Sequence, residues 1–169
     1  LTNISFSNFK LKDGCTSISE MFKDCSALTQ VSLANFNTNG VTNMSGLFSG
    51  CRSLKNIIFC DNFVNMNYNY NLSRMFENCS SLENIDFKYD TLRVIDFSRM
   101  FYGCSKLTIL DLSWFTIANS TTDMLTGCDN LVQIETPVLS PSKTILLPTS
   151  KTYYLVSTGE IVTEITSSM

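Results

Sequence analysis

The chain has 169 residues, of which 44% are apolar and 16% are charged, and its net charge is −3. The apolar share supports a packed core, whereas no cluster of lysine or arginine offers the basic surface that nucleic acid or anionic lipid requires. No apolar run approaches the ~20 residues of a membrane-spanning helix. Histidine, the commonest general base and metal ligand, is absent. We therefore expect no catalytic centre, no cofactor and no metal site.

A short phrase recurs five times, consisting of two large apolar residues, a cysteine three residues later and a leucine three residues after that. Its cysteines are Cys25, Cys51, Cys79, Cys104 and Cys128. The cysteines are separated by 26, 28, 25 and 24 residues, which falls within the roughly 20–29-residue period of leucine-rich repeats. A partial copy opens the chain, with Ile4, Phe6 and Phe9 in the columns of Val31, Leu33 and Phe36.

Each copy combines two hydrophobic periodicities. Met44, Leu47, Phe48 and Cys51 have the i, i+3, i+4, i+7 spacing that predicts a short helix. Downstream, apolar residues alternate with polar ones as in 31–33, which predicts a short strand. Because such units bury their apolar faces only by stacking, we predict an α/β solenoid over residues 1–136. It would be a leucine-rich-repeat-like right-handed coil with a parallel concave sheet and short convex helices, made of the partial copy and about five repeats.

The composition changes at Pro137, which is the first of the three prolines of the chain. Segments 144–147, 152–156 and 161–165 are rich in β-forming residues, and 157–160 has the composition of a hairpin turn. Residues 137–169 are therefore expected to form a C-terminal β-hairpin cap, with the start of a following module as the alternative.

The five periodic cysteines are predicted to be reduced core residues that face inward from the helices. Helices pack about 8–10 Å apart, so disulfides between neighbouring copies would exceed the ~7 Å limit on the Cα–Cα distance. Cys15 and Cys60 lie outside this column, and the sequence leaves their state open.

The outward strand positions are expected to form the binding face. Asp86, Asp111 and Glu135 fall in one line there, either as a solvated acidic face or as ligands of a hard cation, and we favour the first. Tyr89 and Trp114 lie just past the strands, either as interface anchors or folded onto the core. The predicted partner-binding residues are Gln30, Ser32, Asn56, Ile58, Asn84, Asp86, Tyr89, Ile109, Asp111, Trp114, Gln133 and Glu135.

The segments 41–51 (VTNMSGLFSGC) and 97–107 (FSRMFYGCSKL) resemble the repeat of the BspA-like leucine-rich-repeat surface proteins of bacteria, which also occurs in mycoplasmal lipoproteins. This resemblance implies an exported, extracellular protein at the cell surface that adheres to a host or microbial surface protein or glycan, without catalytic residues. We expect a monomeric, non-catalytic binding module that does not insert into the membrane. The alternative is a spacer that holds another domain off the cell surface.

Overall fold

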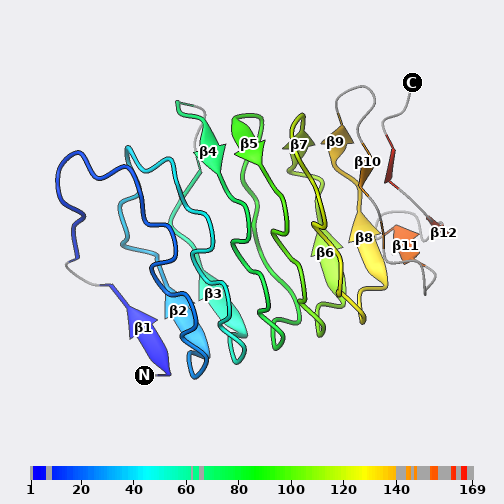
Figure 1. The fold of residues 1–169 in the computed structure, drawn as a ribbon, viewed down its shortest axis with the longest axis horizontal. Coiled ribbons are helices and arrows are strands. Elements are labelled where there is room, and N and C mark those ends of the chain that lie inside the picture. The colour runs from blue at the N-terminus through cyan, green and yellow to red at the C-terminus, as the bar shows by residue number, and fades with distance from the viewer. Residues whose placement is uncertain are drawn as a thin grey trace.

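The computed structural model describes residues 2–6, 9–61, 63–64, 67–139, 144–145, 147, 153–155, 161–162 and 165–166. Over these residues the backbone forms short strands and turns, and none of them is helical. Successive copies of the phrase lie side by side in one row from the N-terminus towards the C-terminus (Figure 1). The strands are β1 (Asn3–Ser5), β2 (Gln30–Ser32), β3 (Asn56–Ile58), β4 (Tyr70–Asn71), β5 (Val94–Asp96), β6 (Ile109–Asp111), β7 (Thr116–Ile117), β8 (Gln133–Glu135), β9 (Val138–Leu139), β10 (Thr144–Ile145), β11 (Tyr153–Leu155), β12 (Ile161–Val162) and β13 (Ile165–Thr166).

The strands predicted after each leucine form parallel pairs between neighbouring copies. β1, β2 and β3 pair in register, with Asn3 opposite Gln30 and Gln30 opposite Asn56. β6 pairs with β8 in the same way, with Ile109 opposite Gln133. The third copy is the exception, because residues 84–86 form no strand and the row of strands is interrupted between β3 and β6. The strand predicted there is therefore wrong.

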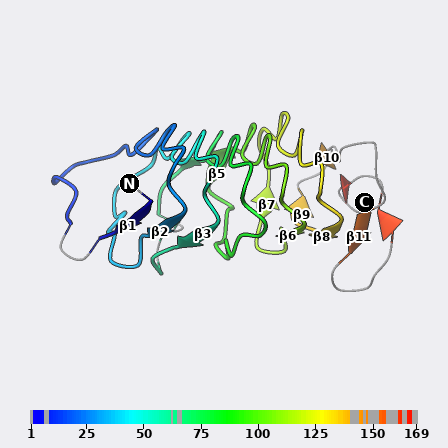
Figure 2. The ribbon, with the colours of Figure 1, turned by 90° about the horizontal axis from the view of Figure 1, so that it is seen from below.

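A second parallel ladder, which the sequence did not predict, joins the residues that lie eight positions before each periodic cysteine. Parallel bridges connect Ser17 to Asn43 and Asn43 to Asn71, β4 pairs with β5, and Asp96 is bridged to Ser120. A third short pairing joins β7 to β9. Except where the row of strands is interrupted after β3, neighbouring repeats are consequently tied by backbone contacts on more than one side of the molecule. Figure 2 shows the row of repeats from below.

The predicted helices are wrong. The segments between the second ladder and the cysteines, 17–25, 43–51, 71–79, 96–104 and 120–128, are chains of tight turns that we call turn ribbons. Within a ribbon every second amide donates to the carbonyl three residues earlier, as in Leu47 N to Met44 O at 3.3 Å and Cys51 N to Phe48 O at 3.1 Å. The alternate amides donate to the next ribbon, as in Phe48 N to Met75 O at 2.9 Å.

Left-handed backbone conformations explain why these segments are not helical. Each ribbon has two residues with positive φ, four positions apart, such as Gly46 at 61° and Gly50 at 76°. The third ribbon has Arg74 at 57° and Asn78 at 59° in the same two places. A helix interior requires φ near −63°, whereas a positive φ at the third residue of a turn is the mark of a type II turn.

The cross-repeat hydrogen bonds also correct the predicted architecture. Helices would have set neighbouring repeats about 8–10 Å apart on one side and ~4.8 Å apart on the sheet side, which forces a curve. Here N–H···O=C bonds link adjacent repeats along the ribbons as well as along the strands. The chain is thus a β and turn structure rather than an α/β leucine-rich-repeat coil with convex helices.

The core lies between the ribbons and the strands, and its ribbon side contains a stack of phenylalanine rings. Phe22 stacks on Phe48 with ring centroids 5.4 Å apart, Phe48 on Phe76 at 5.9 Å, and Phe76 on Phe101 at 5.4 Å. The interplanar angles are between 7° and 15°. The inward apolar columns predicted from the phrase are confirmed from the second copy onward, where Met44, for example, is fully buried, whereas Phe9 and Met21 are exposed.

All seven cysteines lie in the described residues and none of them is in a disulfide, and four of the five periodic ones are buried as predicted. Each buried thiol donates to the phenylalanine carbonyl of the preceding ribbon, as in Cys51 Sγ to Phe22 O at 3.0 Å and Cys104 Sγ to Phe76 O at 3.1 Å. Burial raises the pKa of Cys51 to about 12. Cys25 is exposed, contrary to the prediction, because no earlier ribbon covers it among the described residues.

The C-terminal part is described only in short strands. β11 pairs in parallel with β8 and antiparallel with β12, and β10 pairs antiparallel with β13. The predicted turn at 157–160 lies outside the described residues. In the parts of the chain that are described, no helix has the length and apolar character needed to cross a membrane.

Candidate binding surfaces

The strand face presents most of the predicted partner-binding residues to solvent. The in-register pairing brings them together in two groups, one on β2 and β3 and the other on β6 and β8. Ile58 and Ile109 are apolar yet 48% and 42% exposed, respectively. The exposed predicted residues are Gln30, Asn56, Ile58, Asn84, Asp86, Ile109, Trp114 and Gln133, and the half-buried ones are Ser32, Tyr89, Asp111 and Glu135.

A pocket of about 310 Å³ opens on this face where the row of strands is interrupted. On one side it is lined by Asn56 and Ile58 of β3, and on the other by Asn84 and Asp86 of the third copy. Carboxamide, carboxylate and aliphatic groups therefore surround one hollow. The sequence identified these four residues as surface positions, but it did not show that a missing strand would separate them.

The acidic residues of the face are engaged locally rather than with one another. Asp86 forms an ion pair with Lys88 at 2.9 Å, and both side chains are mostly exposed. Asp111 accepts hydrogen bonds from the backbone N–H and the hydroxyl of Ser113, at 2.9 and 2.5 Å. Within the described ranges no cluster of three histidine, cysteine, aspartate or glutamate residues is placed to hold a metal ion.

The two predicted aromatic anchors differ in their surroundings. The Tyr89 hydroxyl donates to the carbonyl of Cys60 at 2.6 Å, and its ring packs against Phe59 and Phe87 at 6.1 and 5.0 Å. Burial accordingly raises the pKa of Tyr89 above its usual value. Trp114 is 50% exposed and contacts no other ring among the described residues. Tyr89 therefore covers the core, whereas Trp114 is available on the surface.

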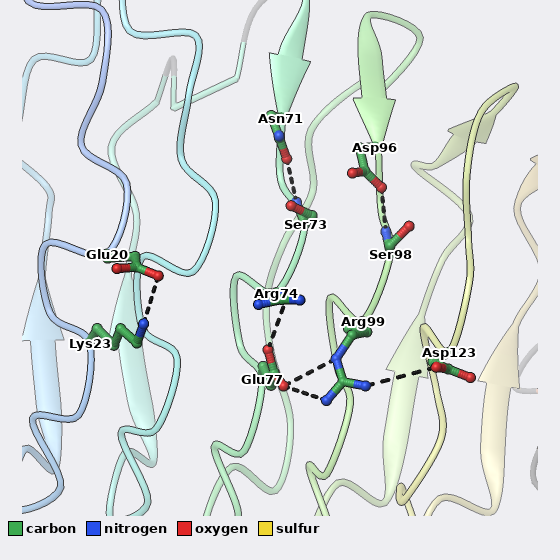
Figure 3. A network of polar contacts seen from close by, with 10 residues as sticks. All are labelled: Glu20, Lys23, Asn71, Ser73, Arg74, Glu77, Asp96, Ser98, Arg99 and Asp123. Carbon is green, nitrogen blue, oxygen red and sulfur yellow. Dashed lines mark hydrogen bonds and ion pairs between the residues drawn. The ribbon is translucent and has the colours of Figure 1, made fainter.

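The ribbon face carries a second hollow, a groove of about 590 Å³ that the sequence analysis did not predict. Gly46 of the second ribbon lines this groove, together with Glu20 and Asp24 of the first ribbon. The side chain of Glu20 lies close to Gly46, and that of Asp24 lies close to Gly50. Figure 3 shows the ion pairs and hydrogen bonds that surround this groove. Among them, Lys23 donates to Glu20 at 2.7 Å.

Glu77 is the centre of the polar contacts on the third and fourth ribbons (Figure 3). Arg99 donates to Glu77 Oε1 from Nε at 3.1 Å and from Nη2 at 2.5 Å, and Arg74 Nε lies 3.7 Å from Glu77 Oε2. Arg99 also lies 3.8 Å from Asp123 and 3.7 Å from the centre of the Tyr102 ring. The hydrogen bonds to Glu77 raise the pKa of Arg99. Glu77 is buried and contacts Arg74 of its own ribbon and Arg99 of the fourth ribbon. Arg99 in turn contacts Asp123, so the fifth ribbon is linked through the guanidinium.

Side chains of the second ladder fix the entry of each ribbon. Asn43 Oδ1 accepts from Ser45 N at 3.1 Å, Asn71 Oδ1 from Ser73 N at 2.9 Å, and Asp96 Oδ1 from Ser98 N at 2.8 Å. These are Asx turns, in which a side chain replaces a backbone acceptor. A signal was present in the sequence, because asparagine or aspartate followed two residues later by serine recurs at this point.

These observations define the class of the protein as a repeat protein whose copies are joined by parallel backbone ladders, with a polar groove on its ribbon face and a pocket on its strand face. Residues 15–136 match the family described as Mycoplasma protein of unknown function, DUF285. The chain belongs to this family. Neither the curated proteins nor the solved structures include a match to the chain.

Proposed function

We propose that the chain is a non-catalytic binding module of a bacterial cell surface that recognises a protein or glycan partner through its strand face. One observation carries this proposal. The outward side chains of β2, β3, β6 and β8 form in-register rows, and two of them, Ile58 and Ile109, are large apolar residues exposed to solvent. Large apolar groups among carboxamides, beside a pocket, provide the mixed surface on which binding sites are built.

Two further points support a surface role. The family consists of mycoplasmal proteins, and the phrase resembles the repeat of BspA-like surface proteins, which implies extracellular display and adhesion. The proposal does not include the leucine-rich-repeat fold that the same resemblance implied. It also does not include catalysis, since the face consists of amide, aliphatic and carboxylate groups and the sequence contains no histidine.

The test is a binding screen of the purified chain against arrays of host matrix proteins, microbial surface proteins and glycans. A strand-face variant that combines Asn56→Ala, Ile58→Ala and Ile109→Ala should lose at least about tenfold in affinity for any partner found, because central interface residues contribute most of the binding energy. A matched ribbon-face variant, Lys23→Ala with Glu20→Ala, should bind as the unmodified chain does.

The alternative outcomes separate the proposal from a spacer role. Equal binding by the unmodified chain and the strand-face variant would place the site elsewhere and refute the proposal. No binding in any array, from a chain that retains its circular dichroism spectrum, would favour a spacer. Circular dichroism of each variant shows whether an affinity change results from altered folding.

A further inference from the structure

The first ribbon, 17–25, has one edge that lacks the contacts made by every later ribbon. The carbonyl oxygens of Ser45, Leu47 and Ser49 in the second ribbon accept hydrogen bonds from the first, at 2.7 to 2.9 Å. The corresponding carbonyls of the first ribbon belong to Ser19, Met21 and Lys23. Among the described residues no amide donates to these three oxygens. The ribbon therefore presents a row of open acceptors with the same spacing as the ones that are filled inside the molecule.

Two apolar side chains on this edge are exposed, unlike their counterparts in the later ribbons. Met21 is 39% exposed, whereas Leu47 and Met75, which hold the same place in the next two ribbons, are fully buried. Cys25 is exposed, whereas Cys51, Cys79, Cys104 and Cys128 are buried. Because the phrase is the same in each copy, the first ribbon differs in exposure only because no earlier ribbon covers it among the described residues. An earlier ribbon would bury Met21 and Cys25 as later residues are buried.

The neighbouring strand already occupies the position of an earlier repeat. β1 pairs in parallel with β2 at the register that β2 has with β3. Phe6, which follows β1, lies 6.1 Å from the Phe22 ring, and Phe59, which follows β3, lies 6.4 Å from the Phe76 ring. The strand part of one more repeat is thus in place, and in the other repeats the ribbon directly precedes this strand along the chain.

We propose that this edge, formed by Ser19, Met21, Phe22, Lys23 and Cys25, is the docking surface for one more turn ribbon of the same phrase. The ribbon is supplied by polypeptide on the amino-terminal side of β1. Its alternate amides would donate to Ser19 O, Met21 O and Lys23 O, and its apolar pair would cover Met21 and one side of Phe22. The interface between neighbouring repeats inside the molecule indicates what binds here. The edge presents the same row of carbonyl acceptors and the same positions of the phrase as the ribbons that are already covered.

The experiment compares the chain with an extended form in which a copy of residues 41–53 is fused directly ahead of Leu1. In this fusion Leu1 takes the place that Leu54 has after the original segment, so the spacing of the repeat is kept. Cys15→Ser and Cys60→Ser in both forms, with serine in place of the copy of Cys51 in the extension, leave Cys25 as the exposed thiol to be followed by alkylation and mass spectrometry. Docking should slow alkylation of Cys25 by about tenfold or more, because the thiol then reacts only after local opening.

A control extension has aspartate in place of the copies of Leu47 and Phe48, and it should leave the alkylation of Cys25 as fast as in the unextended chain. Equal rates in the unextended chain and in the intact extension would overturn the proposal. A different occupant is also detectable. If the unextended chain protects Cys25 as its concentration rises, with dimers in sedimentation, the edge binds a second copy and the proposed source of the ribbon is wrong. The binding screens described above do not depend on this result.

Discussion

Replacing Arg74 by alanine and by glycine distinguishes a turn ribbon from a helix by the sign of a stability difference. Arg74 has a φ of 57°, and its side chain is 62% exposed with one ionic contact at 3.7 Å. Both variants lose that contact, so their difference reports the backbone alone. In a helix glycine is less stable than alanine by about 0.8–1.0 kcal/mol. At a left-handed position alanine instead has a steric cost of about 1–2 kcal/mol relative to glycine. This cost is partly offset by about 0.4–1 kcal/mol, because glycine loses more conformational entropy than alanine on folding.

We therefore expect Arg74→Gly to be more stable than Arg74→Ala by about 0.5–1 kcal/mol. Gly46, which holds the same place in the second ribbon with φ at 61°, provides the reciprocal test. Gly46→Ala should lower the free energy of unfolding, and its Cβ would also lie only 3.2 Å from Glu20 Cγ. Urea unfolding followed by far-ultraviolet circular dichroism measures both differences. A more stable Arg74→Ala together with a stabilising Gly46→Ala would refute the ribbon.

Three further predictions follow from the core and the polar contacts. Phe76→Ala should lower the free energy of unfolding, measured in urea, by about 3–5 kcal/mol. Phe9→Ala, at a residue that is 41% exposed, should lower it by less than about 1.5 kcal/mol. Equal losses in the two variants would contradict the stack of phenylalanine rings. Burial raises the pKa of Cys128 to about 12 from about 8.5 in the unfolded chain. The contribution of the protonated thiol to stability is therefore complete below about pH 8.5 and is lost as pH rises towards 12. Cys128→Ala should flatten the decline of the free energy of unfolding over this range, and an unchanged slope would contradict the raised pKa. Arg99→Gln should lower the free energy of unfolding by about 1–3 kcal/mol, because the buried Glu77 carboxylate loses its charged hydrogen-bond donor. Arg99→Lys should retain part of this stability. An unchanged stability in Arg99→Gln would show that the ion pair is solvated.

The sequence was sufficient to predict which residues face inward, because burial follows from the repeat whatever the backbone does. Copies of one phrase at near-constant spacing place equivalent side chains on top of one another. Phe48 and Phe76 accordingly stack, and Cys51 and Cys79 occupy the same buried place. The parallel register of β2 with β3 follows from the same reasoning. Phe9, Met21 and Cys25 are exceptions, since burial at the first ribbon and the partial copy depends on a neighbour that the periodicity does not supply.

The backbone of the ribbons could not be predicted from apolar spacing alone. Side chains at i, i+3, i+4 and i+7 share one side of a helix, but they also share one side of a chain of turns with a left-handed residue at every fourth position. The distinguishing signal lay just before each cysteine, where Asp24, Gly50, Asn78, Gly103 and Gly127 are all residue types that tolerate positive φ. Glycine at three of these places is equally compatible with a helix end, which is why the spacing indicated helices.

The strand face was predictable as a set of columns but not as a surface with a hollow. In-register pairing of Gln30 with Asn56 follows from the repeat, whereas the missing strand at 84–86 does not. The contact of Glu77 with Arg99 was equally unpredictable. On two neighbouring helices, residues 22 positions apart would be separated by a helix diameter, roughly 8–10 Å. Ribbons joined by backbone hydrogen bonds bring them within ionic contact.

The two backbone ladders have a consequence for how such a protein can vary its binding. Because hydrogen bonds set the spacing of the paired strands and of the ribbons, outward side chains on paired strands such as β2 and β3 or β6 and β8 stand about 4.8 Å apart in rows. The inward columns must keep their apolar residues, since replacing a buried phenylalanine costs several kcal/mol. Outward residues such as Gln30, Ile58 and Ile109 have no such constraint, and substitutions at surface positions of this kind usually change stability by less than about 0.5 kcal/mol. Carboxamide, aliphatic and acidic groups can therefore be exchanged along the rows without altering the scaffold, which is the physical reason to look for recognition on this face.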